Sequence, residues 1–440
     1  MTFTGNTVPF KTEWIKAYQE THYKQPVFPV FADQRFASQL VEGGSIKWSY
    51  DSDADVQQLG ADGSYQSSNK VITDEILNVD QKPYSTFRIP TTQKIQDHRP
   101  TQQKWAVKAM NRIFWSIDAK VLGAMQAAAT SSVTAGDFGG TSGAPITLST
   151  ALAAPIFTAA RRVLRNNSVI YSANKKYSNI VKLDTVDKYP ACAIPAELEE
   201  ALLLAIGFKP GDLGDTVIRE GYLNFLFGFN TFVSTALPFT INYVVAAANA
   251  TNGDTFTIGG NTFQVVTSNT VAGDIKIGVN AAATAANIAA ALSAPYTASS
   301  TYTPLVRSTS TPTAQAAAFV TDMMSAAQVG ATATVTITVL GHGTLPYSQT
   351  VAANGLDSTT AAVHAIFAVS QSIALVIQRY PVLEVSAGGI IGNGATGGFL
   401  AQDFVTYTLA GWKVFKTHIP QIVDVPILAS TYKQPLAILN

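Results

Sequence analysis

The charged residues of this chain are distributed very unevenly along its 440 positions. The chain carries 29 basic and 29 acidic side chains, yet residues 239–354 contain only five of them. This block is rich in Ala, Thr, Val, Gly and Asn, and it includes the runs TFTIGGNTFQVV and ATVTITVL and a helix-like stretch at Ala281–Leu292. Alternating apolar and polar residues are typical of half-buried strands. We therefore predict a β-rich domain at residues 239–356, inserted into a discontinuous core formed by residues 93–238 and 357–440.

Residues 100–129 have the clearest helical pattern in the sequence. Pro100 suits the first turn of a helix, because the missing N–H is not needed there. Apolar side chains recur at helical spacing along one stripe, formed by Trp105, Ala109, Ile113, Ile117 and Val121. At 1.5 Å per residue, a helix of this length is a rod of about 45 Å.

Two alternating segments precede this helix. Gly44–Tyr50 and Tyr84–Pro90 each place apolar side chains on one face and polar side chains on the other. The residues between them are mostly polar, so we expect two antiparallel strands joined by a long projecting loop, at residues 44–92. Residues 1–43, with Pro26 and Pro29, read as an extended arm. A projection that buries little within its own chain is usually mobile or packed against another molecule.

The remaining patterns complete an α+β protein. We predict helices at Leu148–Leu164, Glu197–Ile206 and Thr360–Tyr380, the last ended by Pro381. Tyr222–Leu237 indicates a strand pair, Gly388–Gly398 a glycine-rich loop, and the last strands fall at Phe404–Phe415 and Ile422–Leu428.

Several motifs suggest chemistry, and each fails on context. Gly392–Gly397 matches a dinucleotide fingerprint by its letters, but no strand precedes it and no helix follows it, so a flexible loop is favoured. Asp51, Asp53, Asp55 and Asp62 follow a calcium-loop spacing without the required glycine or the final Glu, which favours a solvated acidic loop over a cation site. Cys192 lies among apolar neighbours and reads as a buried thiol.

The histidines and the overall charge also give no indication of a metal site, of catalysis or of nucleic-acid binding. The five histidines show no metal-ligand spacing, and His364 reads as a core or interface residue rather than as a catalytic base. We predict no catalytic residue, no cofactor and no metal, and therefore no enzyme. With a net charge of zero and no basic run, sequence-specific nucleic-acid binding is not expected. We also expect no signal peptide and no membrane span.

The order of these segments resembles the major capsid proteins of tailed phages, which have the Hong Kong 97-type fold. Gly44–Pro90 is similar to the extended loop of that family, and Pro100–Ala129 to its spine helix. Gly221–Pro238, GYLNFLFGFNTFVSTALP, is similar to a family segment of two short strands that ends in Ser-x-x-Leu-Pro. Ala374–Ile427, with its aromatic GWKVF, resembles the closing strands. The block Gly253–Leu292 resembles a small module inserted in phage capsid and tail proteins.

This resemblance implies a subunit that self-assembles, as hexamers and pentamers, into an icosahedral shell around a viral genome. The expected location is the virion, after assembly in the host cytoplasm. A separate scaffolding protein, a portal protein and a decoration protein would be partners. The candidate subunit contacts are Trp48, Tyr65 and Phe87 of the hairpin loop, and Phe28 and Phe31 of the arm. An encapsulin-like compartment subunit and a phage tail or baseplate protein are the alternatives.

Overall fold

The computed structural model describes residues 26–33, 35, 44–51, 72–90, 101–167, 190–207, 225–245, 249–258, 261–297, 299–306, 323–341, 347–350, 356–385 and 401–428. Helices and strands are mixed along the chain, which confirms the α+β class. Among these residues, no helix combines the length and the apolar character needed to cross a membrane.

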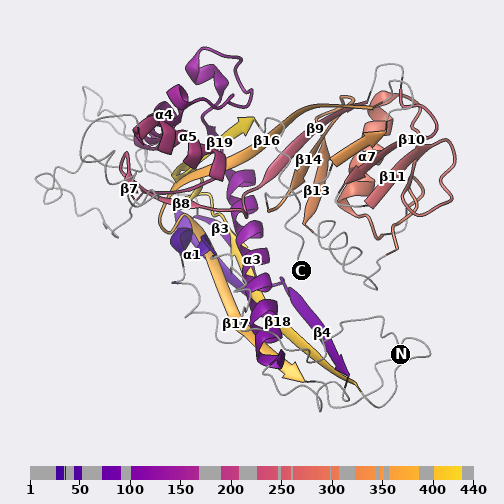
Figure 1. The fold of residues 1–440 in the computed structure, drawn as a ribbon, viewed down its shortest axis with the longest axis horizontal. Helices are drawn as coiled ribbons and strands as arrows, with labels where there is room; N and C mark the ends of the chain where they lie inside the picture. The colour runs from indigo at the N-terminus through magenta and orange to yellow at the C-terminus, as the bar shows by residue number, and fades with distance from the viewer. Residues whose placement is uncertain are drawn as a thin grey trace, which may run out of the picture.

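The long helix α3 (Thr101–Ala128) organises one half of the molecule and confirms the prediction for this segment. It runs along a four-stranded sheet of order β1-β17-β18-β4, as Figure 1 shows. These strands are β1 (Ala32–Asp33), β17 (Ile373–Val385), β18 (Ala401–Lys413) and β4 (Tyr84–Pro90). The apolar stripe of the helix is buried against the sheet, with Ile117, Val121 and Leu122 fully inaccessible to solvent.

A second, larger sheet is built around β16 (Leu356–Val369). One edge of β16 pairs first with β9 (Phe239–Val245) and then with β6 (Pro190–Ile194), and its other edge pairs with β19 (Ile422–Leu428). Beyond β6 come β8 (Phe229–Val233) and β7 (Phe225–Leu226), and β5 (Ser131–Ser132) pairs with β19. Helices α4 (Thr150–Asn166) and α5 (Ala196–Gly207) pack beside this sheet around Phe157, Phe229 and Phe367.

The helix predicted at Thr360–Tyr380 is wrong. This segment forms most of the strands β16 and β17, which are joined by a tight turn in which Gln371 has a φ of 62°. Residues 362–369 are all buried, because neighbouring strands or helices cover both faces of β16. A strand buried on both faces loses its alternating pattern, so its long apolar run resembles a buried helix.

The strand at Gly44–Tyr50 is present as β2 (Ser45–Asp51), but its predicted partner is wrong. β2 pairs antiparallel with β3 (Ile72–Asn78), whereas β4 pairs with β18. The result is a two-stranded ribbon, β2-β3, followed by a strand that belongs to the sheet beside α3. Residues 52–71, between the two strands of the ribbon, lie outside the described part of the chain.

A separate lobe contains the described part of the predicted insert (Figure 1). Among the described residues, its hydrophobic core draws only on positions between Val245 and Val339. It comprises the hairpin β10 (Asp254–Ile258) and β11 (Asn261–Val266), the strands β12 (Asp274–Lys276) and β15 (Tyr347–Thr350), the helix α7 (Ala281–Ser293), and the strands β13 (Met324–Gln328) and β14 (Thr334–Val339). Because β14 pairs with β9, which also pairs with β16, the lobe continues the larger sheet.

Candidate subunit-contact site

The two arm residues predicted to contact a neighbour are buried within their own chain. Phe28 and Phe31 lie on the short helix α1 (Phe28–Phe31) and are 3% and 0% exposed. Their rings belong to the same core as Ile117 of α3 and Ile373 of β17. The expectation of an extended arm at these residues is therefore wrong, and little of either ring is left for another subunit.

The arm is held to the spine helix by Asp118. The Oδ1 atom of this buried carboxylate accepts the backbone N–H groups of Val27, at 3.0 Å, and Phe28, at 2.7 Å. These N–H groups begin α1, where no earlier turn can supply an acceptor. Burial raises the pKa of Asp118 to about 6, although the two N–H donors act in the opposite direction.

A charged pair follows within the same segment, at Asp33. Its buried carboxylate receives the guanidinium of Arg35, with a shortest N–O distance of 2.6 Å. Burial alone would raise the pKa of Asp33, but the hydrogen bonds from Arg35 lower it overall. β1 pairs in parallel with β17 and is the second attachment, so the described residues 26–33 are held against the core.

The ribbon β2-β3 has one face turned inward and one turned outward. On the inner face, Trp48 is half-buried and stacks on Phe415 with a centroid separation of 6.0 Å, while Leu77 is fully buried. Trp48 therefore makes its main described contact within the chain. Of the other predicted contacts, Phe87 lies opposite Phe404 in the β4-β18 ladder, and Tyr65 falls outside the described residues.

The outer face of the ribbon carries a group that the sequence analysis missed. Ile72 and Ile76 are 66% and 50% exposed, and they lie on the same face of β3 as Asp74. Asp74 pairs with Lys47 at 2.6 Å and accepts a hydrogen bond from Ser49 Oγ–H at 2.6 Å, and the pKa of Asp74 is lowered by these bonds. The apolar residues of ITDEIL fall at positions 72, 76 and 77 without a period of two, so the pattern gives no clear strand signal and the segment looks like part of the polar loop.

The residues weighed for chemistry have structural positions instead. Cys192 is fully buried in β6, and burial raises the pKa of its thiol to about 12, which confirms the buried-thiol interpretation. His364 is also buried, on β16 rather than on a helix, and its Nδ1 lies 2.9 Å from Asp424 and its Nε2 2.8 Å from Thr240 Oγ1. This buried polar network joins β16, β19 and β9.

No cofactor or metal site emerges within the described ranges. They contain no group of three or more His, Cys, Asp or Glu side chains that could hold a metal ion. The glycine-rich Gly392–Gly397 and the acidic positions after Asp51 lie outside them. Arg161, near the end of α4, donates a hydrogen bond to the Phe227 carbonyl at 3.0 Å, and so supports the turn between β7 and β8.

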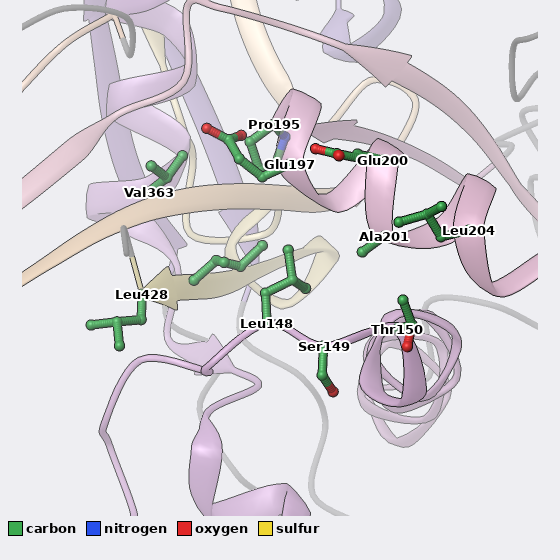
Figure 2. Close-up of a pocket in the computed structure, with 11 residues that line it drawn as sticks. Leu148, Ser149, Thr150, Pro195, Glu197, Glu200, Ala201, Leu204, Val363 and Leu428 are labelled. Carbon is green, nitrogen blue, oxygen red and sulfur yellow. The ribbon is translucent and has the colours of Figure 1, made fainter. Parts of the chain in front are cut away.

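A pocket of about 260 Å³ lies where α4, α5 and β19 meet (Figure 2). Its walls are mainly apolar, and Glu197 and Glu200 of α5 contribute two carboxylates. Leu428, the last residue of β19, lines it as well. The lining residues are Leu148, Ser149, Thr150, Pro195, Glu197, Glu200, Ala201, Leu204, Val363, Ile427 and Leu428.

Comparisons with known proteins give matches in structure alone. No protein-family model and no curated protein matches the sequence. A solved structure from Mycobacterium phage Che8 is similar at 11% identity, covering 95% of this chain and 97% of that chain, with a TM-score of 0.51. The capsid structure of cyanophage P-SCSP1u is 12% identical, covering 97% of this chain and 94% of that one, with a TM-score of 0.48. The head structure of Helicobacter pylori bacteriophage KHP40 is 6% identical, with 96% of each chain covered and a TM-score of 0.47. The likeness to the Che8 structure spans almost all of both chains, and it establishes that this chain has the fold of that phage structure.

Proposed function

We propose that this chain is a major capsid protein, which self-assembles into the icosahedral shell of a tailed phage and acts in the virion. The observation that carries the proposal is the fold shared with the phage Che8 structure over 95% of this chain. The order of elements supports it: a ribbon, a 28-residue helix beside a sheet, and a second sheet flanked by helices. We further propose a structural rather than a catalytic role, since the chemically suggestive residues Cys192 and His364 are buried in the core.

The outer face of the β2-β3 ribbon is our proposed contact with a neighbouring subunit. Two isoleucines exposed on one strand are costly in isolation, and covering each could contribute roughly 1.5–3 kcal/mol. A shell multiplies such contacts, because each subunit meets several neighbours held at high effective concentration. A separate scaffolding protein, a portal protein and a decoration protein remain proposed partners. The inserted domain at 239–356 is likewise a proposal, supported by its self-contained core.

Assembly of point variants tests this function. We expect the double variant Ile72→Ser and Ile76→Ser to remain folded, because both side chains point to solvent in the single chain, but to form few or no closed shells. Val271→Ser is the matched control, since Val271 is 65% exposed in the lobe and lies outside the ribbon. Circular dichroism checks folding, and electron microscopy with sedimentation measures assembly.

The outcomes of this experiment distinguish a capsid protein from a tail or baseplate protein and from an encapsulin-like compartment subunit. Polyhedral shells from the parent chain, lost in the double variant and kept in the control, support the capsid function and the contact face. Normal shells from the double variant would reject the contact face alone. Rods or rings from the parent chain would reject the shell and favour a tail or baseplate protein, whereas native shells filled with an enzyme cargo would favour an encapsulin-like compartment.

A further inference from the structure

The two-stranded ribbon β2-β3 has one edge along β2 whose backbone groups are open. The Val79 N–H donates to the Gly44 carbonyl at 2.8 Å, which fixes the alternation of hydrogen-bonded pairs along this ladder. Because bonded and non-bonded pairs alternate in an antiparallel ladder, the backbone N–H and C=O groups of Ser45, Lys47 and Ser49 point away from β3. All three residues are exposed, and these backbone groups form no hydrogen bond within the described part of the chain.

The opposite edge of the ribbon, along β3, faces β18 of the core. Lys413 Nζ donates to the Ile76 carbonyl at 3.0 Å. The Asn78 carbonyl lies so close to Gly411 that a Cβ atom on that glycine would overlap it. Ile76 and Asn78 are positions whose carbonyls the alternation turns outward, so both contacts agree with it. The base of β3 is therefore held against the core, and β2 is the open edge.

The lobe shows how this chain closes an edge strand elsewhere. β13 is at the end of the larger sheet among the described strands, and the N–H and C=O groups of Ala326 both bind the Ser293 hydroxyl, at 3.3 and 2.6 Å. The end of α7 thus occupies the place that a further strand would take. β2 has no such cover in the described chain. Its Lys47, a residue type that protects edges, is drawn across the ribbon to Asp74 at 2.6 Å.

We propose that the open edge of β2 pairs with an extended segment of a second copy of this chain, through the backbone groups of Ser45, Lys47 and Ser49. This inference rests on the proposed function, because it names how the ribbon contacts a neighbouring subunit. Strand addition to an open edge takes its affinity from main-chain hydrogen bonds. A two-stranded ribbon is marginally stable in water, so a third strand also stabilises the ribbon itself.

Two further observations favour a second copy as the partner. The chain has a net charge of zero, so two copies do not repel each other over long distances. Ile72 and Ile76, exposed on the outer face of the same ribbon, offer apolar surface next to the added strand. Backbone pairing at the edge and apolar contact on the face can thus come from one neighbour.

A proline at position 49 tests the pairing in the full-length chain. Ser49→Pro removes an N–H that points to solvent in the single chain, and proline is tolerated on the open side of an edge strand. Ser49→Ala is the matched control, because it loses the same Oγ hydrogen bond to Asp74 but keeps the backbone N–H. We expect Ser49→Ala to assemble like the parent chain. Ser49→Pro should need at least about tenfold more protein to assemble, since a carbonyl of the added strand loses its donor. Sedimentation and electron microscopy measure assembly.

Hydrogen exchange gives a second, independent measurement on the parent chain. In the dissociated subunit, the N–H groups of Lys47 and Ser49 should exchange rapidly, whereas that of Trp48, which points to β3, should be protected. In the assembled chain, we expect the protection factors of Lys47 and Ser49 to rise at least about tenfold, because the added strand covers both groups. Protection of Trp48 in dissociated Ser49→Pro checks that the ribbon remains folded. If the proline unfolds the ribbon, the exchange of the parent chain decides.

The outcomes separate this inference from the capsid function. Shells that form equally well from Ser49→Pro and Ser49→Ala would overturn the edge pairing and leave the capsid function intact, as would parent shells with unchanged protection at Lys47 and Ser49. Rods or rings in which both N–H groups become protected would reject the shell and support the pairing. A parent chain that does not assemble would reject both.

Discussion

Leu340, which directly follows β14 of the lobe, lies against Gly123 of the spine helix α3. The two residues are so close that a Cβ atom on Gly123 would overlap the Leu340 Cδ2 methyl group. The next residue, Gly341, has a φ of 88°, and a Cβ there would overlap the ring of Trp115. Ser116 of α3 also donates a hydrogen bond to Met323 Sδ at 3.7 Å. These contacts hold the lobe against α3.

The first prediction concerns this contact between the lobe and α3. Gly123→Leu should lower the free energy of unfolding by about 1–3 kcal/mol, because the added side chain overpacks the contact with Leu340. Adding Leu340→Ala should restore part of that loss, since it makes room for the new side chain. Urea denaturation measures both. Ala127→Leu, at an exposed position of the same helix, is the control and should change stability little. Equal losses at the two positions would contradict the close packing at Gly123.

The second prediction concerns the lobe as a unit. A fragment of residues 239–356 should fold alone and unfold cooperatively, because the described part of its core draws only on residues between Val245 and Val339. The complementary excision should be costly, since it removes Met323 and Leu340 from beside α3 and strips β9 from one edge of β16. Circular dichroism and thermal denaturation of both products check this. A fragment without a cooperative transition would show that the lobe needs the core.

The sequence identified those elements whose patterns are local. The helix at residues 101–128, the hairpin of β10 and β11, and the short strands β7 and β8 each follow from the spacing of apolar residues. It failed where both faces of a strand are buried. In β16 and the first part of β17, apolar residues do not alternate with polar ones. The turn at Gln371 also lacks the glycine or asparagine that usually marks a positive φ.

The sequence could not predict strand partners or buried polar contacts, because both depend on residues that lie far apart along the chain. The alternation of β2 indicates a strand but does not say whether it pairs with β3 or β4. Asp118 looked like one polar residue on a long helix, and only the folded chain brings it to Val27 and Phe28, about 90 residues away. For the candidate site, the prediction chose exposed-looking aromatics, and two of them, Phe28 and Phe31, fill the core instead.

The third prediction is a pH dependence at Asp118. Its pKa is raised to about 6 when α1 covers it, against an ordinary value of 3.8, so the covered state binds the proton more tightly. The stabilisation by this group is therefore complete below about pH 4 and is lost as the pH rises through about 6, a difference on the order of 3 kcal/mol. Acidification from pH 7.5 to 5 should strengthen the attachment of the arm, measured as higher hydrogen-exchange protection factors at Val27 and Phe28, which correct for the intrinsic slowing of exchange at lower pH.

Asp118→Asn isolates this effect. The amide oxygen of Asn can still accept both N–H groups but does not titrate, so the attachment should be strong and independent of pH between 5 and 7.5. Asp118→Ala removes the acceptor and should speed exchange at both pH values, because two buried N–H groups lose their partner. If the parent chain showed the same protection factors at pH 5 and 7.5, Asp118 would not control the attachment.

The fourth prediction concerns the buried pair of His364 and Asp424. Their side chains are 8% and 13% exposed, and His364 Nδ1 lies 2.9 Å from the carboxylate. Removing one partner leaves the other buried without its hydrogen bond, so Asp424→Ala should lower the free energy of unfolding by roughly 1–3 kcal/mol. In a double-mutant cycle with His364→Ala, we expect a coupling energy of at least about 1 kcal/mol.

The reference pair is Arg162 and Asp137, whose side chains are 60% and 27% exposed at an N–O distance of 3.0 Å. Their coupling energy should stay below about 1 kcal/mol, because solvent screens the interaction. Urea denaturation of both cycles compares them directly, and equal coupling in the two pairs would mean that burial does not strengthen the link between β16 and β19.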